Sequence, residues 1–240
     1  MYRITTVVLA LTLAAGADTI TFEGFDHGEI LTDQIAGVEF SATNIGGGPD
    51  LSIIFDSRET GTADDDLEDP FTGGNLPSNT LLGNMLIIAE NGNLDRDGLV
   101  DSPDDEGSRP AGTIHIRFDE AILAFGLDLV DVESSVSEAG TLVFFDENGN
   151  TATRTFSEIA VRDPSIDWGN NSANRVIPFT IKELGLDPIV GVDVRMGGSG
   201  AIDNLTDGNS IPEPGALILA VLGAGSLALR RRRKMTLAAA

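Results

Sequence analysis

A segment from Asn93 to Asp104 places oxygen-bearing side chains at the spacing of a calcium-binding loop. Counted from Asn93 as position one, Asp95 and Asp97 occupy positions three and five, and Gly98 follows at position six, where such a loop turns sharply. Such a loop also binds the ion at positions seven, nine and twelve, through a backbone carbonyl at position seven and often through a water molecule at position nine. In this segment these positions are Leu99, Asp101 and Asp104. The segment therefore predicts a calcium site.

This segment resembles the DxDxDG calcium loop but not a complete EF-hand, because no helical pattern flanks it. Asp104 stands where that loop prefers glutamate, whose longer side chain reaches the ion with both oxygens, so we expect lower affinity and selectivity. Asn93 replaces the usual aspartate at position one. The alternative interpretation is a flexible Asp-Gly turn that Asp105 and Glu106 extend.

A second acidic segment, residues 56–70, follows directly after an apolar run that ends in Phe55. Its candidate calcium ligands are Asp56, Asp64 and Asp66. Like charges at this density repel one another unless a cation neutralises them, and calcium takes six to eight oxygen ligands. The alternative interpretation is a solvated acidic loop.

Catalytic side chains are sparse, and we expect no enzyme activity. The chain has no cysteine and 2 histidines, His27 and His115. His115 lies in an alternating strand pattern and is expected at a surface or sheet edge, whereas His27 lies beside a glycine and is expected to be solvated or to join a metal site. No Gly-x-Ser-x-Gly motif marks a serine nucleophile.

Trp168 is the candidate for contact with a sugar. It is the single tryptophan of the chain, and it lies in a loop-like stretch, where an exposed aromatic ring can serve as a platform for a pyranose. The alternative is that Trp168 covers one end of the folded core. Sugar contact mediated by calcium and aspartate side chains would need no aromatic ring.

The elements that must position these residues are predicted to be β-strands. Short apolar runs rich in β-branched and aromatic residues recur from residue 19 to residue 205, separated by Gly, Asn, Asp and Pro clusters, and indicate roughly ten or eleven strands. Residues 141–156 give the clearest hairpin signal, with Asn148 and Gly149 as the residues that tolerate positive φ. In residues 113–118, alternation places Ile114 and Ile116 on the face opposite His115. Residues 182–185 are expected to form one helical turn.

Many short strands without helical periodicity predict an all-β protein with a single β-sandwich domain of the jelly-roll type. An immunoglobulin-like sandwich is the alternative, because strand number does not distinguish the two. Residues 201–205 resemble the last strand of many exported jelly-roll modules, carbohydrate-binding modules among them. That resemblance implies that Asp203 lies beside a structural calcium ion.

The chain is strongly acidic, with 15 Lys and Arg against 38 Asp and Glu and a net charge of −23. Without Arg3, Glu213 and the five cations of residues 230–234, the body keeps 9 basic and 37 acidic residues, a net charge of −28. Such a body is not expected to bind nucleic acid or anionic lipid. A divalent cation such as calcium would offset the self-repulsion, and a high-salt habitat is the competing explanation.

Both ends of the chain carry targeting features. Arg3, the apolar residues 4–15 and the small residues 15–17 indicate a signal peptide of residues 1–17, which implies export through the Sec translocon. Near the other end, Pro212, Glu213 and Pro214 precede an apolar stretch, residues 215–229, that is shorter than the ~20 residues needed to cross a bilayer. A cationic cluster follows, which includes Arg230, Arg231, Arg232 and Arg233.

This three-part tail resembles the PEP-CTERM sorting signal of exported bacterial proteins. The resemblance implies transient membrane insertion of a C-terminal helix, processing near the Pro-Glu-Pro motif by an exosortase-type membrane protease, and a final place on the cell surface or in the extracellular matrix. An ordinary C-terminal membrane anchor is the alternative. The folded domain is then expected at residues 18–210 and the sorting signal at residues 211–240.

These features together predict an exported, surface- or matrix-associated protein that calcium stabilises. Its expected role is structural, or the binding of extracellular polysaccharide in a biofilm, which is the setting that the tail's resemblance implies. The alternative is a secreted hydrolase that acts on matrix glycans, since a glycosidase needs only two carboxylates at a suitable separation.

Overall fold

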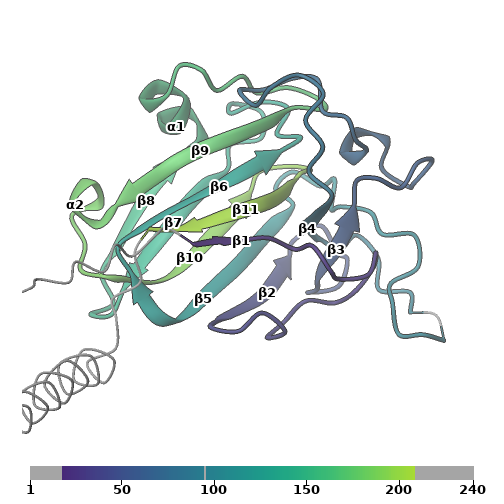
Figure 1. Cartoon of the computed structure of the whole chain (residues 1–240), viewed down its shortest axis with the longest axis horizontal. Helices are drawn as coiled ribbons and strands as arrows, with labels where there is room; N and C mark the ends of the chain where they lie inside the picture. Colours follow the sequence, from purple (N-terminus) through teal and green to yellow (C-terminus); the bar gives the residue numbers. More distant parts are fainter. Residues whose placement is uncertain (1–17, 95, 209–240) are drawn as a thin grey trace, which may run out of the picture. The chain divides into compact units, whose positions relative to one another are not determined.

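Antiparallel β-strands make up most of the regular structure of residues 18–94 and 96–208, which the computed structural model describes (Figure 1). Sheet A contains, in spatial order, β3 (Ser52–Asp56), β4 (Asn84–Ile88), β11 (Ala201–Asp207), β6 (Ala124–Val130) and β9 (Ala173–Thr180), with β1 (Asp18–Ile20) also paired to β11. Sheet B contains β2 (Val38–Asn44), β5 (Gly112–Ile122), β10 (Ile189–Met196), β7 (Thr141–Asp146) and β8 (Thr151–Thr155). The predicted all-β sandwich is confirmed.

The strands pair as a double ribbon that has been rolled up. Hydrogen bonds join β4 to β11, β5 to β10, β6 to β9 and β7 to β8, so β4 to β7 form one arm of a long hairpin and β8 to β11 the other. Successive pairs along this ribbon alternate between sheet A and sheet B. This is the jelly-roll connectivity, and it decides against the immunoglobulin-like alternative.

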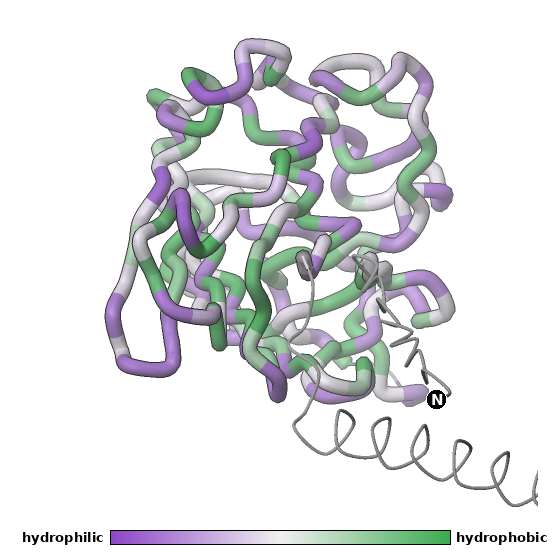
Figure 2. Tube along the Cα trace, turned by 60° about the vertical axis from the view of Figure 1, so that its left-hand side comes forward, coloured by the Kyte–Doolittle hydropathy of each residue, from purple (hydrophilic) through white to green (hydrophobic). Residues whose placement is uncertain are grey.

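The main core lies between the two sheets and follows from the alternation of apolar residues along the strands. In β5, Ile114 and Ile116 are fully buried, whereas His115 and Arg117 point to the other face of sheet B, as predicted. Figure 2 shows hydrophobic segments running through the middle of the domain and hydrophilic segments in many of the outer loops. Each strand of sheet B thus contributes one face to the core and one to the surface.

A second, smaller core covers the outer face of sheet A. The segment between β3 and β4 supplies Leu67 and Phe71, which join a buried cluster with Phe55, Ile87 and Ala201 of the sheet. The acidic residues of this segment therefore flank a buried leucine, in the short 3-10 turn Asp65–Leu67. Leu67 and Phe71 thus pack the segment on sheet A, while several of its polar residues, Glu59 and Asp65 among them, stay exposed.

Helix α1 (Phe156–Arg162) was not predicted, whereas α2 (Ile181–Leu184) occupies the expected helical turn. Both helices begin with a capping box, in which a threonine and a glutamate three residues later satisfy each other's backbone N–H groups: Thr155 with Glu158, and Thr180 with Glu183. The Thr-x-x-Glu spacing that begins at the last residue of β8 was therefore the signal for α1.

The predicted hairpin between β7 and β8 is present, but its turn differs in detail from the expectation. Gly149 has a φ of 80°, whereas Asn148 does not adopt positive φ. The carboxylate of Asp146 accepts hydrogen bonds from the backbone N–H groups of Asn148 (2.9 Å) and Asn150 (2.8 Å). An Asx-type turn therefore organises this loop.

The predicted signal peptide and the predicted sorting tail lie outside the described residues. Within residues 18–94 and 96–208, no helix combines the length and the apolar character needed to cross a membrane.

Replacing Leu67 with Ala should destabilise the domain by about 2–5 kcal/mol, because it leaves a cavity under the acidic segment. Denaturant unfolding followed by tryptophan fluorescence would measure this loss. The matched control is Leu81→Ala in the same segment, where the side chain is 69% exposed and the expected change lies within about 0.5 kcal/mol. Equal effects of the two substitutions would show that the second core contributes little.

Candidate functional site

Carboxylates from separate parts of the chain line a pocket of about 450 Å³ at one end of sheet A. Strands β4 and β6 both run antiparallel to β11, which lies between them, so the ends of β4 and β6 meet the beginning of β11 there. Residues next to these strand ends form the pocket together with the acidic segment after β3 and with residues from the segment 104–107 before β5. Its acidic lining residues are Asp64, Asp65, Asp66, Glu90, Asp104, Asp105 and Asp131.

Residues 104–106 are held against the end of β4 by backbone hydrogen bonds. The N–H of Glu90 donates to the carbonyl of Asp104 (3.0 Å), and the N–H of Glu106 donates to the carbonyl of Ile88 (3.0 Å). Asp105 is only 5% exposed, and its carboxylate accepts a hydrogen bond from the backbone N–H of Gly200, just before β11. This pairing places Asp104 and Asp105 at the pocket.

Asp131 follows β6 and is 2% exposed. Its φ of 54° lies in the left-handed region, where the chain turns out of the strand. Its carboxylate accepts a hydrogen bond from the backbone N–H of Asn171 (2.6 Å), and its own N–H donates to the carbonyl of Ser172 (2.8 Å). The backbone therefore holds this carboxylate at the pocket wall.

The segment after β3 contributes the third side of the pocket. Asp64 caps the 3-10 turn, since its carboxylate accepts a hydrogen bond from the N–H of Asp66 (3.0 Å). The hydroxyl of Thr62 donates to the carbonyl of Asp64 (2.9 Å). Buried Leu67 anchors the same turn, so the packing of the second core fixes the position of these carboxylates.

Burial and mutual repulsion raise the pKa values of these carboxyl groups. Burial raises the pKa of Asp131 to about 8, and the nearby charges of Asp66 and Asp64 add to the effect. Burial likewise raises the pKa of Asp105 well above its usual range, and it raises the pKa values of Asp64 and Asp104.

A hydrogen bond with Asp104 is the main cause that raises the pKa of Glu90. Among the described residues, none that lines this pocket is basic. Ionisation of the whole cluster is therefore unfavourable unless a cation enters from solution.

Three of these carboxylates converge closely enough to share one ion. Asp64, Asp104 and Asp105 each offer an oxygen, and the three oxygens lie within 4.8 Å of one another. Calcium binds oxygens at about 2.3–2.6 Å, so oxygens on opposite sides of one ion are separated by about 5 Å. The donors are hard oxygen ligands, which suit calcium or magnesium better than softer metals.

The pocket joins the two acidic segments that the sequence presented as separate sites. Asp64 and Asp66 come from the first segment, and Asp104 comes from the second. The rest of the predicted calcium loop, namely Asn93, Asp97, Leu99 and Asp101, does not line this pocket.

The predicted calcium loop has some of the expected backbone features. Gly98 has a φ of 88°, in agreement with the predicted sharp turn, and the N–H of Asp101 donates to the carbonyl of Asn93 (2.7 Å). Asp95 lies outside the described residues. Calcium binding by this loop therefore stays a prediction.

Asp56 lies away from the pocket and has a different partner. Its carboxylate pairs with both Nε (2.6 Å) and a terminal nitrogen (2.9 Å) of Arg58. Its backbone N–H donates to Nδ1 of His27 (2.9 Å), and burial lowers the pKa of that histidine. His27 is thus a structural residue of the β3 end in its neutral form.

Asp203 lies on the outer face of sheet A, opposite Asp128 of β6, and not at the acidic pocket. Asp203 is 2% exposed, and one of its carboxylate oxygens has no hydrogen-bond partner among the described residues. Burial raises its pKa to about 8, with the charge of Asp128 contributing. Asp128 itself pairs through both oxygens with Arg175 (2.8 and 2.7 Å).

Trp168 packs on the core and is only partly exposed. Its ring stacks on Phe156 of α1, with centroids 5.5 Å apart and an angle of 26° between the planes. This placement corresponds to the alternative expectation, a cover over part of the core.

Sequence inspection did not identify Glu90, Asp105 and Asp131 as site residues. Asp131 carried a usable signal, because it is an acidic residue at the end of a long apolar run, residues 122–132. Asp105 was attributed to a turn. Their shared position depends on strand pairing between distant segments, which has no local sequence pattern.

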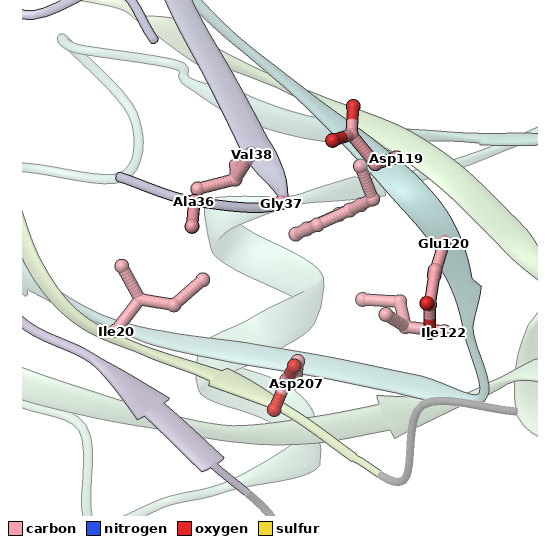
Figure 3. Close-up of a pocket in the computed structure, with 9 residues that line it drawn as sticks. Ile20, Ala36, Gly37, Val38, Asp119, Glu120, Ile122 and Asp207 are labelled. Carbon is pink, nitrogen blue, oxygen red and sulfur yellow. The ribbon is translucent and has the colours of Figure 1, made fainter. Parts of the chain in front are cut away.

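A second hollow of about 330 Å³ lies at the opposite end of β11 (Figure 3). Ile20, Val38 and Ile122 give it an apolar lining, and Asp119, Glu120 and Asp207 stand around it. In the described part of the chain, the group of possible metal ligands that converges on one point is Asp64, Asp104 and Asp105, and it lies at the other end. The acidic pocket is therefore the better candidate for ion binding.

Comparison with known families identifies the C-terminal tail. Residues 210–234 match the family model described as the PEP-CTERM protein-sorting motif. This match confirms the predicted sorting signal and indicates an exported, exosortase-sorted surface protein. It covers the tail and not the β-sandwich. No curated protein matches the chain.

Asp131→Asn should remove part of the pH dependence of stability. The folded-state pKa of Asp131 is about 8 against an ordinary value of 3.8, so the folded protein holds a proton between these values that the unfolded chain has lost. Stability should therefore fall as pH rises from about 4 to 8, by up to about 1.4 kcal/mol per pH unit for this group.

The measurement is urea unfolding of both proteins at several pH values with EDTA present. The variant should have the shallower slope and the higher stability at pH 8. Glu147→Gln at the exposed hairpin tip is the control and should follow the wild type. Parallel curves for the Asp131 variant and the wild type would contradict the assignment.

Proposed function

We propose that this chain is an exported surface protein and that a calcium ion bound in the acidic pocket stabilises its β-sandwich. The observation that carries the proposal is the convergence of Asp64, Asp104 and Asp105, whose oxygens lie within 4.8 Å of one another. The described residues around them add further carboxylates and no basic side chain. The ligands come from the β3–β4 segment and from the segment before β5. A bound ion would therefore connect the acidic segment after β3 to the end of sheet A.

Repulsion among these carboxylates is not relieved by any basic residue among the described residues that line the pocket. Asp105 and Asp131 are nearly fully buried, and the pKa values of both are raised, so each must stay protonated or face a cation. A calcium ion at the pocket would favour the ionised forms and would make two of the loops rigid. Extracellular modules commonly bind calcium with dissociation constants of about 10⁻⁴–10⁻³ M, which suits an exported protein.

We propose further that the protein acts in the extracellular matrix. The sorting motif at residues 210–234 supports a surface location, and the tail's resemblance supports an association with exopolysaccharide and biofilm. A calcium ion with coordination positions left open would offer contacts to sugar hydroxyls. The chain would then act as a structural or polysaccharide-binding protein, and its contacts with sugar would not depend on Trp168 alone.

Calcium should raise the melting temperature of the protein by several degrees, and magnesium should not. A ligand at 100 times its dissociation constant stabilises the folded state by about 2.7 kcal/mol. The Asp64→Asn, Asp105→Asn double variant, which leaves every ligand position of the predicted loop unchanged, should lose this gain. Scanning calorimetry in calcium, magnesium and EDTA would measure it.

The control is the Asp95→Ala, Asp97→Ala double variant, which changes the predicted calcium loop and leaves the pocket intact. It should keep the calcium-dependent gain. An unchanged melt of the wild type in calcium would remove the proposal, and loss of the gain in the control alone would move the site to residues 93–104. An equal gain from sodium chloride at the same ionic strength would indicate general screening of the acidic surface.

Glu213→Ala in the Pro-Glu-Pro motif should prevent exosortase processing. The variant should accumulate in the membrane fraction at full mass, whereas the wild type should appear at the cell surface with the tail removed. Fractionation with mass spectrometry of the C-terminus would measure this. Glu147→Ala, at an exposed position of the β7–β8 hairpin, is the control and should be processed normally; processing of both variants would contradict recognition of this motif.

A further inference from the structure

A chain of hydrogen-bonding side chains crosses three strands on the exposed face of sheet B. The hydroxyl oxygen of Thr43 on β2 lies 2.9 Å from Nε2 of His115 on β5. Nδ1 of the same ring lies 2.8 Å from a carboxylate oxygen of Asp193 on β10. Strand register produces this order, because Asp193 is directly opposite His115 and Thr43 is diagonal to it.

The chemistry of the three groups assigns the protons. An ionised Asp193 can only accept, so Nδ1 of His115 must carry a hydrogen and donate it. In the neutral ring, Nε2 then has a free lone pair and accepts from the Thr43 hydroxyl. The hydroxyl of Thr43 therefore points its proton at a base, and a carboxylate holds that base in the required tautomer.

Asp193 is positioned firmly. It is 7% exposed, and a terminal nitrogen of Arg117 donates to the carboxylate oxygen that faces His115 (2.7 Å). The other terminal nitrogen of Arg117 donates to the carbonyl of Ile116 (2.9 Å), and its guanidinium lies 5.1 Å from the centre of the Phe145 ring. Thr43, by contrast, is exposed and lies on β2, the edge strand of the sheet.

We propose that Thr43, His115 and Asp193 act as nucleophile, general base and positioning carboxylate in acyl transfer from carboxylic esters. The Thr43 oxygen forms a bond to the acyl carbon as its proton passes to Nε2 of His115. The bond from the acyl carbon to the alcohol oxygen breaks, and His115 returns the proton to the leaving alcohol. Water then hydrolyses the acyl-threonine by the same steps, with His115 again as the base.

Arg195 is placed to stabilise the negative charge that develops on the acyl oxygen. It is exposed on the same face, and it lies in one row with Thr113 and Thr43 across β10, β5 and β2. Neighbouring strands are about 4.8 Å apart, so the backbones at Arg195 and Thr43 are about 10 Å apart, which an extended arginine spans over the small Thr113. On an open surface such stabilisation is weaker than in a site that excludes water, so we expect a modest rate.

The open position of Thr43 indicates the class of substrate. Because it stands on the surface of the edge strand β2, the site can take an ester that an extended molecule presents, such as a polysaccharide that carries small O-acyl groups. This activity does not depend on the acidic pocket, and it departs from the expectation, drawn from the sequence, that the chain has no catalytic group.

The test is release of 4-nitrophenolate from 4-nitrophenyl acetate by the purified full-length chain, in EDTA so that calcium plays no part. The wild type should react about 10²-fold faster than Thr43→Val and His115→Gln, in keeping with the contribution of a general base. Acid quenching followed by peptide mass spectrometry should find the acetyl group on Thr43. Asp193→Asn should lower kcat and leave KM nearly unchanged.

The matched control is Thr153→Val, another exposed threonine in sheet B, which should react like the wild type. Thermal melts of the Thr43 and Thr153 variants should agree, which would exclude misfolding as the cause of a loss. Equal rates for Thr43→Val and the wild type would overturn the proposal, because His115 would then react alone. An acetyl group found on another residue would overturn it as well.

Discussion

The position of β11 between β4 and β6 is the constraint on which the acidic pocket depends. Both neighbours run antiparallel to β11, so β4 and β6 must end at the same end of sheet A where β11 begins. Ala89 also pairs with Asp105 as an isolated bridge, which extends the sheet by one more residue and places Asp104 and Asp105 at that end. The rolled ribbon therefore concentrates acidic residues that are far apart in the sequence.

A shortage of cations explains why these carboxylates differ from other buried acids of the domain. The body has 9 basic residues for 37 acidic ones, so arginine can neutralise only some of the buried carboxylates. Asp128 pairs with Arg175, Asp193 with Arg117, and Glu138 with Arg109 (2.8 Å). In the part of the chain that the structure describes, no basic residue lines the pocket, and burial together with the charges of Asp66 and Asp64 raises the pKa of Asp131.

The two sheets present different outer surfaces. The segment between β3 and β4 covers part of sheet A and forms a second core around Leu67 and Phe71. Sheet B keeps an exposed face on which Thr43, His115 and Arg195 stand. The outer face of sheet A therefore anchors the segment between β3 and β4, whereas the outer face of sheet B is open to molecules outside the protein.

The sequence by itself determined the strands, the sandwich and the sorting signal, because each is written in a local pattern. Alternation placed Ile114 and His115 on opposite faces, and the order of the Pro-Glu-Pro motif, apolar stretch and arginines identified the tail. Only the tertiary structure brought Asp64 to Asp104 and Asp105 and placed Asp203 elsewhere. These outcomes depend on which strands pair, and pairing is a long-range choice set by packing of the whole core, so no local spacing encodes it.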